Sequence, residues 1–240
     1  MSHRIRLYLD LEFTGLHQHT TPISLALVCE HGQRFYAEFT DYDRDQVTPW
    51  IKEHVIDHLS LGHYSDNGIE NIPPNCQVRG DRAYVSKWLT EFITNQSGHD
   101  GDGTLEIWAD VPHYDWVLFC ELFGGAFNIP KCIHYQCFDL ATLLQENGID
   151  PDVDRLKFAQ HYAALDSMFH AMPAHHAMRD ALLARQCHEL LHRSHPNKIF
   201  EMSQHPIWAS MLQNDETELC FYRCAGYVFV RWYGQRCVPR

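Results

Sequence analysis

Residues 5–13 have the sequence IRLYLDLEF, in which every second residue from Leu7 onward is apolar. This period of two is typical of a β-strand with one face toward a core, because successive side chains point to opposite faces. Asp10 and Glu12 therefore stand side by side, on the face opposite Leu9 and Leu11. Two carboxylates about 5 Å apart repel each other by roughly 3 kcal/mol at an effective dielectric near 20. The fold must neutralise them with a proton, a basic partner or a cation.

The same periodicity predicts the elements that follow. Further strands are expected over residues 23–29 and 33–40, joined by a tight turn at His31-Gly32, and over residues 104–109 and 132–138. Helices are expected over residues 43–59, 81–94, 113–123, 140–146 and 177–192, with a weaker helical region over 152–169. The opening hairpin is antiparallel and the later strands alternate with helices. This pattern predicts an α/β fold in which a mixed five-stranded sheet is flanked by helices.

The composition changes near the C-terminus. From His195 onward, prolines and an asparagine replace the helical pattern, and residues 219–223 and 227–232 predict a hairpin that turns at Ala225-Gly226. We therefore expect a main domain over residues 1–195 and a C-terminal extension over residues 196–240 that packs on it.

The overall composition is that of a globular chain. It has 240 residues, of which 45% are hydrophobic, enough for a full core. No apolar run approaches the ~18 residues that a membrane span requires, and the first apolar stretch carries two acidic residues where a signal peptide tolerates no charge. The nine cysteines include no C-x-x-C pair, so reduced thiols are expected. These features predict a cytoplasmic protein that does not bind membranes.

The charge limits how the chain could act on nucleic acid. Lys and Arg number 19 and Asp and Glu number 31, which gives a formal net charge of −12 with neutral histidines. A chain this acidic is not expected to bind nucleic acid strongly through its general surface. Any function on nucleic acid would rest on a local site, where metal ions can supply positive charge.

Two more acidic residues lie where a site is expected. Asp115 follows the strand that ends at Ala109 and lies near the start of a helix, and α/β folds place ligand sites at such strand ends. Asp180 lies in the last predicted helix, five residues after His175, and five residues span about 140° of a regular helix. The side chains of His175 and Asp180 can face the same ligand only if His175 belongs to the loop that enters the helix. Taken by themselves, His175 and Asp180 fit better as a solvated histidine and aspartate at a helix start.

Three motifs, taken in order, resemble those of the DEDDh exonucleases. This superfamily includes polymerase proofreading subunits, RNase T and oligoribonuclease. The first motif is LDLEFTGL at residues 9–16, the second is Tyr114-Asp115, and the third is HHAMRDA at residues 175–181, which matches H-x-A-x-x-D-A. The resemblance spans about residues 5–192. Within the superfamily, residues 107–115 and the short loop before the final helix look most like the bacterial RNase AS type.

The resemblance implies an RNase H-like fold and a two-metal site. By analogy, Asp10, Glu12 and Asp180 would ligate one Mg²⁺ or Mn²⁺. Asp10 would also bridge to a second ion that Asp115 reaches directly or through water, and His175 would be the general base. Four carboxylates suit two hard divalent cations. Ions ~3.5–4 Å apart can activate water and stabilise the leaving 3′ oxygen of a phosphodiester.

The resemblance also implies residues that bind substrate. Phe13 would stack on the terminal base, the backbone around Thr14 and Gly15 would hold the terminal sugar, and Leu16 would lie beside the next base. Phe13 fits equally well as a core residue at the strand end. His176 is a second histidine beside the expected base, although it does not fit the motif.

The resemblance implies a metal-dependent 3′-5′ exoribonuclease that hydrolyses single-stranded 3′ ends to nucleoside 5′-monophosphates. Two alternatives stay open. One is a single-stranded DNA 3′-5′ exonuclease, since the motifs do not separate RNA from DNA. The other is a catalytically silent subunit that binds nucleic acid on the same fold. Related nucleases are often dimers, so the resemblance also leaves a homodimer open.

Overall fold

A computed structural model describes residues 4–64, 66–97, 105–162, 167–193, 219–224 and 227–232. The chain separates into two compact units, Met1–His192 and Arg193–Arg240. In the second unit, β8 (Leu219–Cys224) and β9 (Tyr227–Trp232) pair antiparallel, which confirms the two strands expected there. The other residues of the predicted C-terminal extension, including its turn at Ala225-Gly226, lie outside the described residues.

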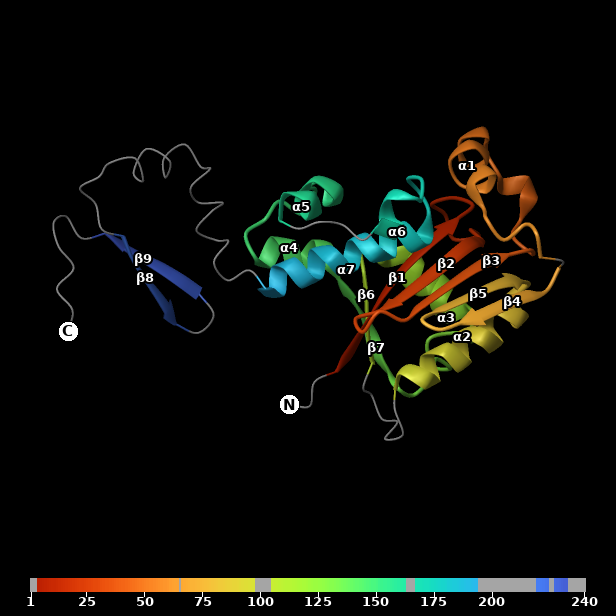
Figure 1. Cartoon of the computed structure of the whole chain (residues 1–240), viewed down its shortest axis with the longest axis horizontal. Helices are drawn as coiled ribbons and strands as arrows, with labels where there is room; N and C mark the ends of the chain where they lie inside the picture. Colours follow the sequence, from red (N-terminus) through yellow and green to blue (C-terminus); the bar gives the residue numbers. More distant parts are fainter. Residues whose placement is uncertain are drawn as a thin grey trace. The chain divides into compact units, whose positions relative to one another are not determined.

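The first unit is built on a mixed sheet of seven strands in the order β4-β5-β3-β2-β1-β6-β7 (Figure 1). Its centre is formed by β1 (Ile5–Phe13), β2 (Pro22–Cys29) and β3 (Arg34–Phe39), which are joined antiparallel. On the other side of β1, β6 (Leu105–Ala109) and β7 (Ile133–Asp139) are added in parallel. The α/β class and the mixed sheet flanked by helices are confirmed.

The predicted number of five strands was wrong. Between the helices predicted over residues 43–59 and 81–94, where the sequence predicts no strand, the chain forms β4 (Gly68–Ile72) and β5 (Asn75–Gly80), and β5 runs parallel to β3. Gly, Asn and Pro dominate this segment and predict turns, whereas the pairing with β3 depends on residues about 40 positions away. Such long-range pairing overrides the weak strand preference of the local sequence.

Most helices begin and end close to their predicted limits. They are α2 (Arg82–Gln96), α3 (His113–Glu121), α4 (Leu140–Glu146) and α7 (Ala177–Arg193), while the weaker region contains α5 (Arg155–Tyr162) and α6 (Ser167–His170). None of the described helices has the length and apolar character needed to cross a bilayer.

The single helix predicted over residues 43–59 is three short pieces. They are η1 (Arg44–Gln46), α1 (Pro49–His54) and η2 (Ile56–His58). Proline lacks an N–H and fits only the first turn of a helix, so α1 has to start anew at Pro49. Thr48 caps this start by accepting a hydrogen bond from the Ile51 amide.

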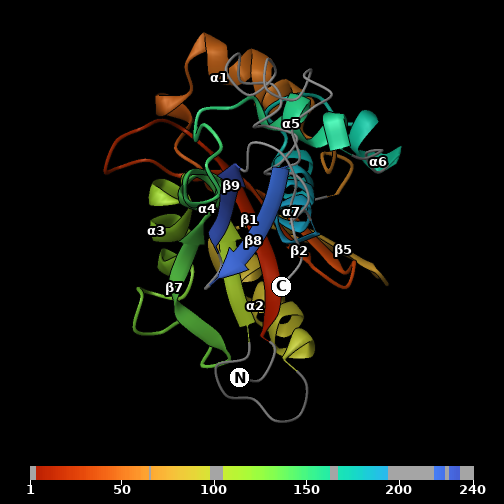
Figure 2. The same ribbon diagram turned by 90° about the vertical axis from the view of Figure 1, so that its left-hand side faces the viewer.

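Helices cover both faces of the sheet (Figures 1 and 2). On one face, Leu7, Leu9 and Leu11 belong to a core that includes Leu89 of α2 and Phe119 of α3. On the other face, Tyr8 and Ala26 pack in a cluster with Ala177, Met178, Ala181 and Leu182 of α7. Since Asp10 and Glu12 share the face of Tyr8, they point toward α7.

Candidate metal centre

Three carboxylates from β1 and α7 meet on this face. Asp10, Glu12 and Asp180 each place one oxygen within 4.8 Å of the others. Asp10 and Glu12 are neighbours because they are two residues apart on a strand, and Asp180 joins them from the first turn of α7. Divalent cations bind oxygen ligands at about 2.0–2.6 Å, so one ion placed between these oxygens can touch all three. The donor set, oxygen alone, fits a hard cation such as Mg²⁺ or Mn²⁺.

The fourth predicted carboxylate, Asp115, lies beside this group. Its side chain is 8% exposed, and its Oδ1 accepts a hydrogen bond of 2.8 Å from the Leu11 amide, between Asp10 and Glu12 on β1. Its negative charge raises the pKa values of both strand carboxylates. Asp115 is not among the three that converge within 4.8 Å. It therefore borders the cluster.

The cluster binds protons unusually well. Burial, reinforced by the charges of Asp115 and Asp180, raises the pKa of Asp10 well above its usual range. Burial and then Asp180 raise the pKa of Glu12 to about 8. Burial also raises the pKa values of Asp115 and Asp180 to about 6 each, although Arg179 opposes the shift of Asp180. Buried carboxylates that repel one another in this way favour a cation that can replace their protons.

A fifth carboxylate, Asp110, follows β6 and was not predicted to belong to this region. Its charge raises the pKa values of Asp10, Asp115 and Asp180. Arg155 of α5 neutralises it with two hydrogen bonds of 2.8 Å. The position of Asp110 directly after a central strand was a usable signal, but nothing local in the sequence pairs it with Arg155.

His175 lies in the loop that enters α7, because that helix begins at Ala177. Its φ of 56° places it in the left-handed region, which is uncommon for a residue other than glycine. The ring lies edge-on to Trp50, with 5.0 Å between centroids, and 6.2 Å from the ring of His54. Burial lowers its pKa, and the charges of His54 and Arg179 lower it further. The neutral form of His175, which can accept a proton, is therefore favoured.

The neighbouring His176 serves the fold. It is buried and stacked on Tyr36, with 4.8 Å between ring centroids. Its Nδ1 accepts from the Met178 amide at 3.2 Å and its carbonyl accepts from the Arg179 amide at 2.7 Å, which fixes the start of α7. Burial lowers its pKa to about 4. These contacts engage His176 in the helix start and leave His175 as the candidate base.

The predicted substrate-binding residues differ in how far they are free to bind. Leu16 is 76% exposed, and Phe13 is partly buried with its ring 5.6 Å from that of Tyr114. The Thr14 side chain is buried, and its amide donates to the Thr21 carbonyl. The Gly15 amide donates to Oγ1 of Thr20. Both amides are engaged inside the loop, so a sugar would have to be held through carbonyl oxygens.

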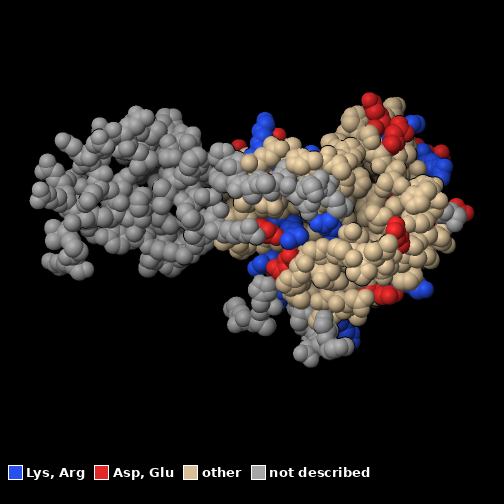
Figure 3. Space-filling view, in the orientation of Figure 1, with Lys and Arg blue, Asp and Glu red and all other residues tan. Residues whose placement is uncertain are grey.

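Charges of both signs are interspersed on the face of the first unit shown in Figure 3. Lys and Arg side chains lie next to Asp and Glu side chains, and uncharged residues cover much of the remaining area. The described residues of this face form no broad basic area of the kind that holds a long nucleic acid.

Comparison with known proteins adds three findings. No protein-family model matches the chain. Two curated proteins named 3′-5′ exoribonuclease, from Mycobacterium tuberculosis strains CDC 1551 / Oshkosh and ATCC 25618 / H37Rv, are 28% identical over 144 residues, covering 60% of this chain and 76% of theirs. A solved structure of exonuclease I (apo) matches 88% of this chain and 47% of its own, with 12% identity and a TM-score of 0.43.

Proposed function

We propose that this protein is a metal-dependent 3′-5′ exoribonuclease that hydrolyses single-stranded 3′ ends to nucleoside 5′-monophosphates. The observation that carries the proposal is the convergence of Asp10, Glu12 and Asp180 within 4.8 Å. Asp115 supports the proposal, because its side chain accepts a hydrogen bond from the amide of Leu11, which lies between Asp10 and Glu12 on β1. The similarity to two proteins named 3′-5′ exoribonuclease favours the same reaction.

The carboxylates divide between two ions. Asp10, Glu12 and Asp180 would hold the first, and Asp10 and Asp115 would hold the second. When bound, a pair of Mg²⁺ or Mn²⁺ ions supplies an activated water and stabilises the charge on the leaving 3′ oxygen. The burial that raises the pKa of Glu12 to about 8 also lowers the local dielectric, which strengthens the attraction of these carboxylates for cations.

His175 is the base of the proposed reaction. Its neutral ring accepts the proton of the attacking water while the phosphodiester bond breaks. The left-handed backbone at His175 turns the loop just before α7, and the edge of Trp50 limits where the ring can lie. Both features restrict the position of the base.

The 3′ end of the RNA substrate binds beside β1. Leu16 and the ring pair of Phe13 and Tyr114 offer apolar surface to the last bases. Base stacking on aromatic rings is worth ~1–3 kcal/mol and tolerates any sequence, which suits a trimming enzyme. We prefer RNA as the substrate because the relatives are named exoribonucleases. A protein that distinguishes RNA from DNA must contact the 2′-hydroxyl.

The domain division is part of the proposal. We place the nuclease in residues 1–195 and treat residues 196–240 as its extension. The chain separates into compact units at Arg193, close to the predicted boundary. The homodimer and the cytoplasmic location stay predictions.

A degradation assay tests the function. Single-stranded RNA and DNA of the same sequence, each labelled at the 5′ end, are incubated with Mg²⁺, Mn²⁺ or EDTA. We expect RNA to shorten stepwise from its 3′ end, only with metal, with release of nucleoside 5′-monophosphates. Faster shortening of DNA would reassign the substrate. If neither strand is shortened with either metal, the protein is not an exonuclease.

A further inference from the structure

A groove of about 710 Å³, the α3 groove, lies between α3 and the loop that joins β1 to β2. Figure 2 shows this loop, in red, above α3. The loop supplies residues 17–22, and α3 supplies Tyr114, Val117, Leu118 and Glu121. These four residues lie on one face of the helix, because they are three, four and seven positions apart. The groove therefore follows α3 for about two turns, or roughly 10 Å.

The α3 groove begins at the proposed nuclease site. Tyr114 borders both, since it lines the groove and its ring lies 5.6 Å from that of Phe13. On the loop side, the groove begins at His17, directly after the exposed Leu16. The ring of His17 lies against Gly15, where an added Cβ would be 3.0 Å from two of its atoms. A strand with its last base at Phe13 and the next beside Leu16 can therefore continue into the groove.

The lining of the α3 groove suits a single nucleic-acid strand. Tyr114 offers an aromatic ring and Val117, which is 57% exposed, offers apolar surface to bases. Arg82, at the start of α2, is half exposed and donates from Nε to Asp41 at 2.9 Å. Its planar guanidinium can still offer terminal nitrogens to a phosphate. Further ring nitrogens come from three histidines, His17, His19 and His113.

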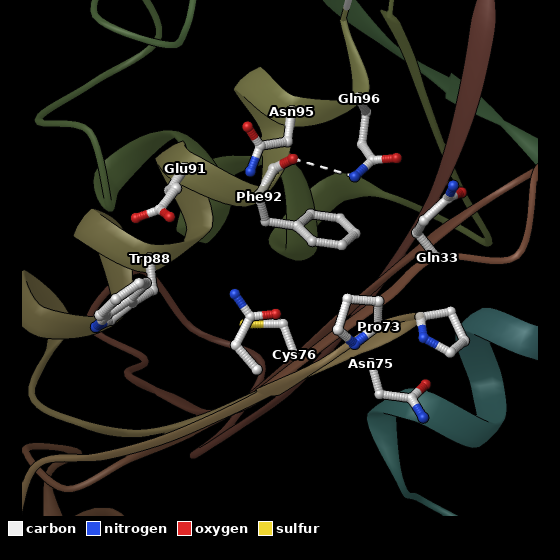
Figure 4. A pocket seen from close by; sticks show the side chains of 11 residues that line it. Gln33, Pro73, Asn75, Cys76, Trp88, Glu91, Phe92, Asn95 and Gln96 are labelled. Atoms are coloured by element: carbon white, nitrogen blue, oxygen red, sulfur yellow. Dashed lines mark hydrogen bonds between the residues drawn. The ribbon is translucent and has the colours of Figure 1, made fainter.

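The cavity beside α2 (Figure 4) differs from the α3 groove in its charge and size. It encloses about 210 Å³ between α2 and the turn that joins β4 to β5. Glu91 is the charged residue of its lining, and the described lining contains no Lys, Arg or His. A phosphate would meet a carboxylate there and no cation. The α3 groove is therefore the better place for a phosphodiester chain.

We propose that the α3 groove binds the one or two nucleotides that precede the last two of a single-stranded substrate. This inference rests on the proposed nuclease function and adds a length preference to it. A volume of 710 Å³ falls within the ~300–1,000 Å³ of sites that enclose ligands of nucleotide size. Glu121, at the far end of the groove, repels the next phosphate and ends the contact. Strands of four nucleotides are therefore better substrates than dinucleotides, and longer strands gain nothing more.

Single-stranded oligonucleotides of two, three, four and six residues with the same 3′ sequence test the length preference. The measured quantity is kcat/KM for release of the 3′-terminal nucleotide by the full-length chain, in Mg²⁺ or Mn²⁺ at constant salt. We expect kcat/KM to rise at least about tenfold from two to four nucleotides and to stay constant from four to six. Most of the rise should lie in KM, because the groove binds nucleotides away from the reacting phosphate.

Two variants place the effect in the groove. Val117→Asp adds a carboxylate to the groove face of α3, and Arg82→Gln removes the cation. Each should lower the ratio of kcat/KM between the hexanucleotide and the dinucleotide at least about fivefold. A loss of folded protein lowers both values and leaves this ratio unchanged. Thr90→Asp and Lys87→Gln make the same charge changes at exposed positions of α2 outside the groove lining, and the ratio should stay at the wild-type value.

Equal kcat/KM values for two and six nucleotides would overturn the groove proposal and leave the nuclease function intact. A ratio that falls equally in Val117→Asp and Thr90→Asp would also overturn it, because the effect would then come from net charge. If no oligonucleotide is hydrolysed, the nuclease function fails, and fluorescence anisotropy of a labelled hexanucleotide tests the groove by itself. At least about fivefold weaker binding by Val117→Asp than by the wild type is then expected, and equal binding would overturn the proposal.

Discussion

Arg155 holds Asp110 by two hydrogen bonds, from Nε to Oδ2 and from a terminal nitrogen to Oδ1, each 2.8 Å long. The other terminal nitrogen donates to the Val153 carbonyl at 2.6 Å. Asp110 borders the acidic cluster, since its charge raises the pKa of Asp10. The pair neutralises one carboxylate at the edge of the cluster and joins α5 to the end of β6. A planar guanidinium is suited to this two-point contact, whereas an ammonium is not.

Removing Arg155 should therefore destabilise the protein. Arg155→Met leaves Asp110 without its cation and should lower the free energy of unfolding by about 1.5–3 kcal/mol, as measured by urea denaturation. Arg155→Lys should recover part of this loss, because it restores the charge without the second bond. Adding Asp110→Asn to Arg155→Met should recover more. If the double variant is as unstable as Arg155→Met, the unpaired charge is not the cause.

The stability of the metal-free protein should fall as the pH rises from 6.5 to 8. Glu12 has a pKa of about 8 in the folded chain against an ordinary value of 4.5, so between these values only the folded chain keeps the proton. The raised pKa of Glu12 stabilises the folded chain fully below pH 4.5, and this stabilisation is lost as the pH rises through 8. His176 and His188 have the opposite effect, since their pKa values fall to about 4 and about 3, but their effect is confined below pH 6.5.

Thermal unfolding at several pH values checks this prediction. Glu12→Gln, which cannot ionise, should flatten the dependence between pH 6.5 and 8. Saturating Mg²⁺ or Mn²⁺ should raise the midpoint of unfolding more at pH 8 than at pH 6.5, because metal binds the deprotonated carboxylates. A midpoint that rises with pH in metal-free buffer would contradict the raised pKa values.

The proposed base should be required for the rate but not for metal binding. His175→Ala should slow nucleotide release about 10²- to 10⁴-fold, since general-base catalysis contributes that much. Binding of Mn²⁺, followed by calorimetry, should be unchanged because the ring is not a ligand. His31→Ala, an exposed histidine on the β2–β3 turn, serves as the control. A metal affinity that falls together with the rate would make His175 a ligand instead.

Thr14 should stabilise the loop after β1. Its Oγ1 donates to Oε1 of Gln46 at 2.5 Å and accepts from the Thr21 amide at 2.9 Å. Thr14→Val keeps the shape but leaves both partners unpaired, so the free energy of unfolding should fall by about 1–3 kcal/mol. Thr90→Val, on an exposed face of α2, should change it by at most about 0.5 kcal/mol. Equal effects of the two variants would show that the Thr14 bonds are not important.

Local patterns were enough to predict the central part of the fold. The alternation in Ile5–Phe13 gave β1 and the shared face of Asp10 and Glu12, because a strand fixes side-chain direction every second residue. The same patterns did not predict β5, which forms a strand because it pairs with β3 rather than because of its own composition. They also missed the new helix start at Pro49, although proline is itself a local signal for the first turn of a helix.

The site shows a similar division. The sequence motifs named the three carboxylates that converge, and the helical pattern predicted the helix start at Ala177. The left-handed backbone turn at His175, which decides how the histidine lies, does not follow from spacing. The pairing of Asp110 with Arg155 joins residues 45 positions apart. Contacts of this kind arise only when the elements pack.

Release of nucleoside 5′-monophosphates from single-stranded RNA, compared between the wild type and Asp10→Asn in Mg²⁺, tests most directly whether the acidic cluster is the catalytic centre. Asp10→Asn keeps the shape of the side chain, and Asp152→Asn, at an exposed loop position, is the control. We predict metal-dependent release by the wild type and the control, and a rate at least about 10³-fold lower for Asp10→Asn. Release by Asp10→Asn at the wild-type rate would contradict the assignment of the cluster.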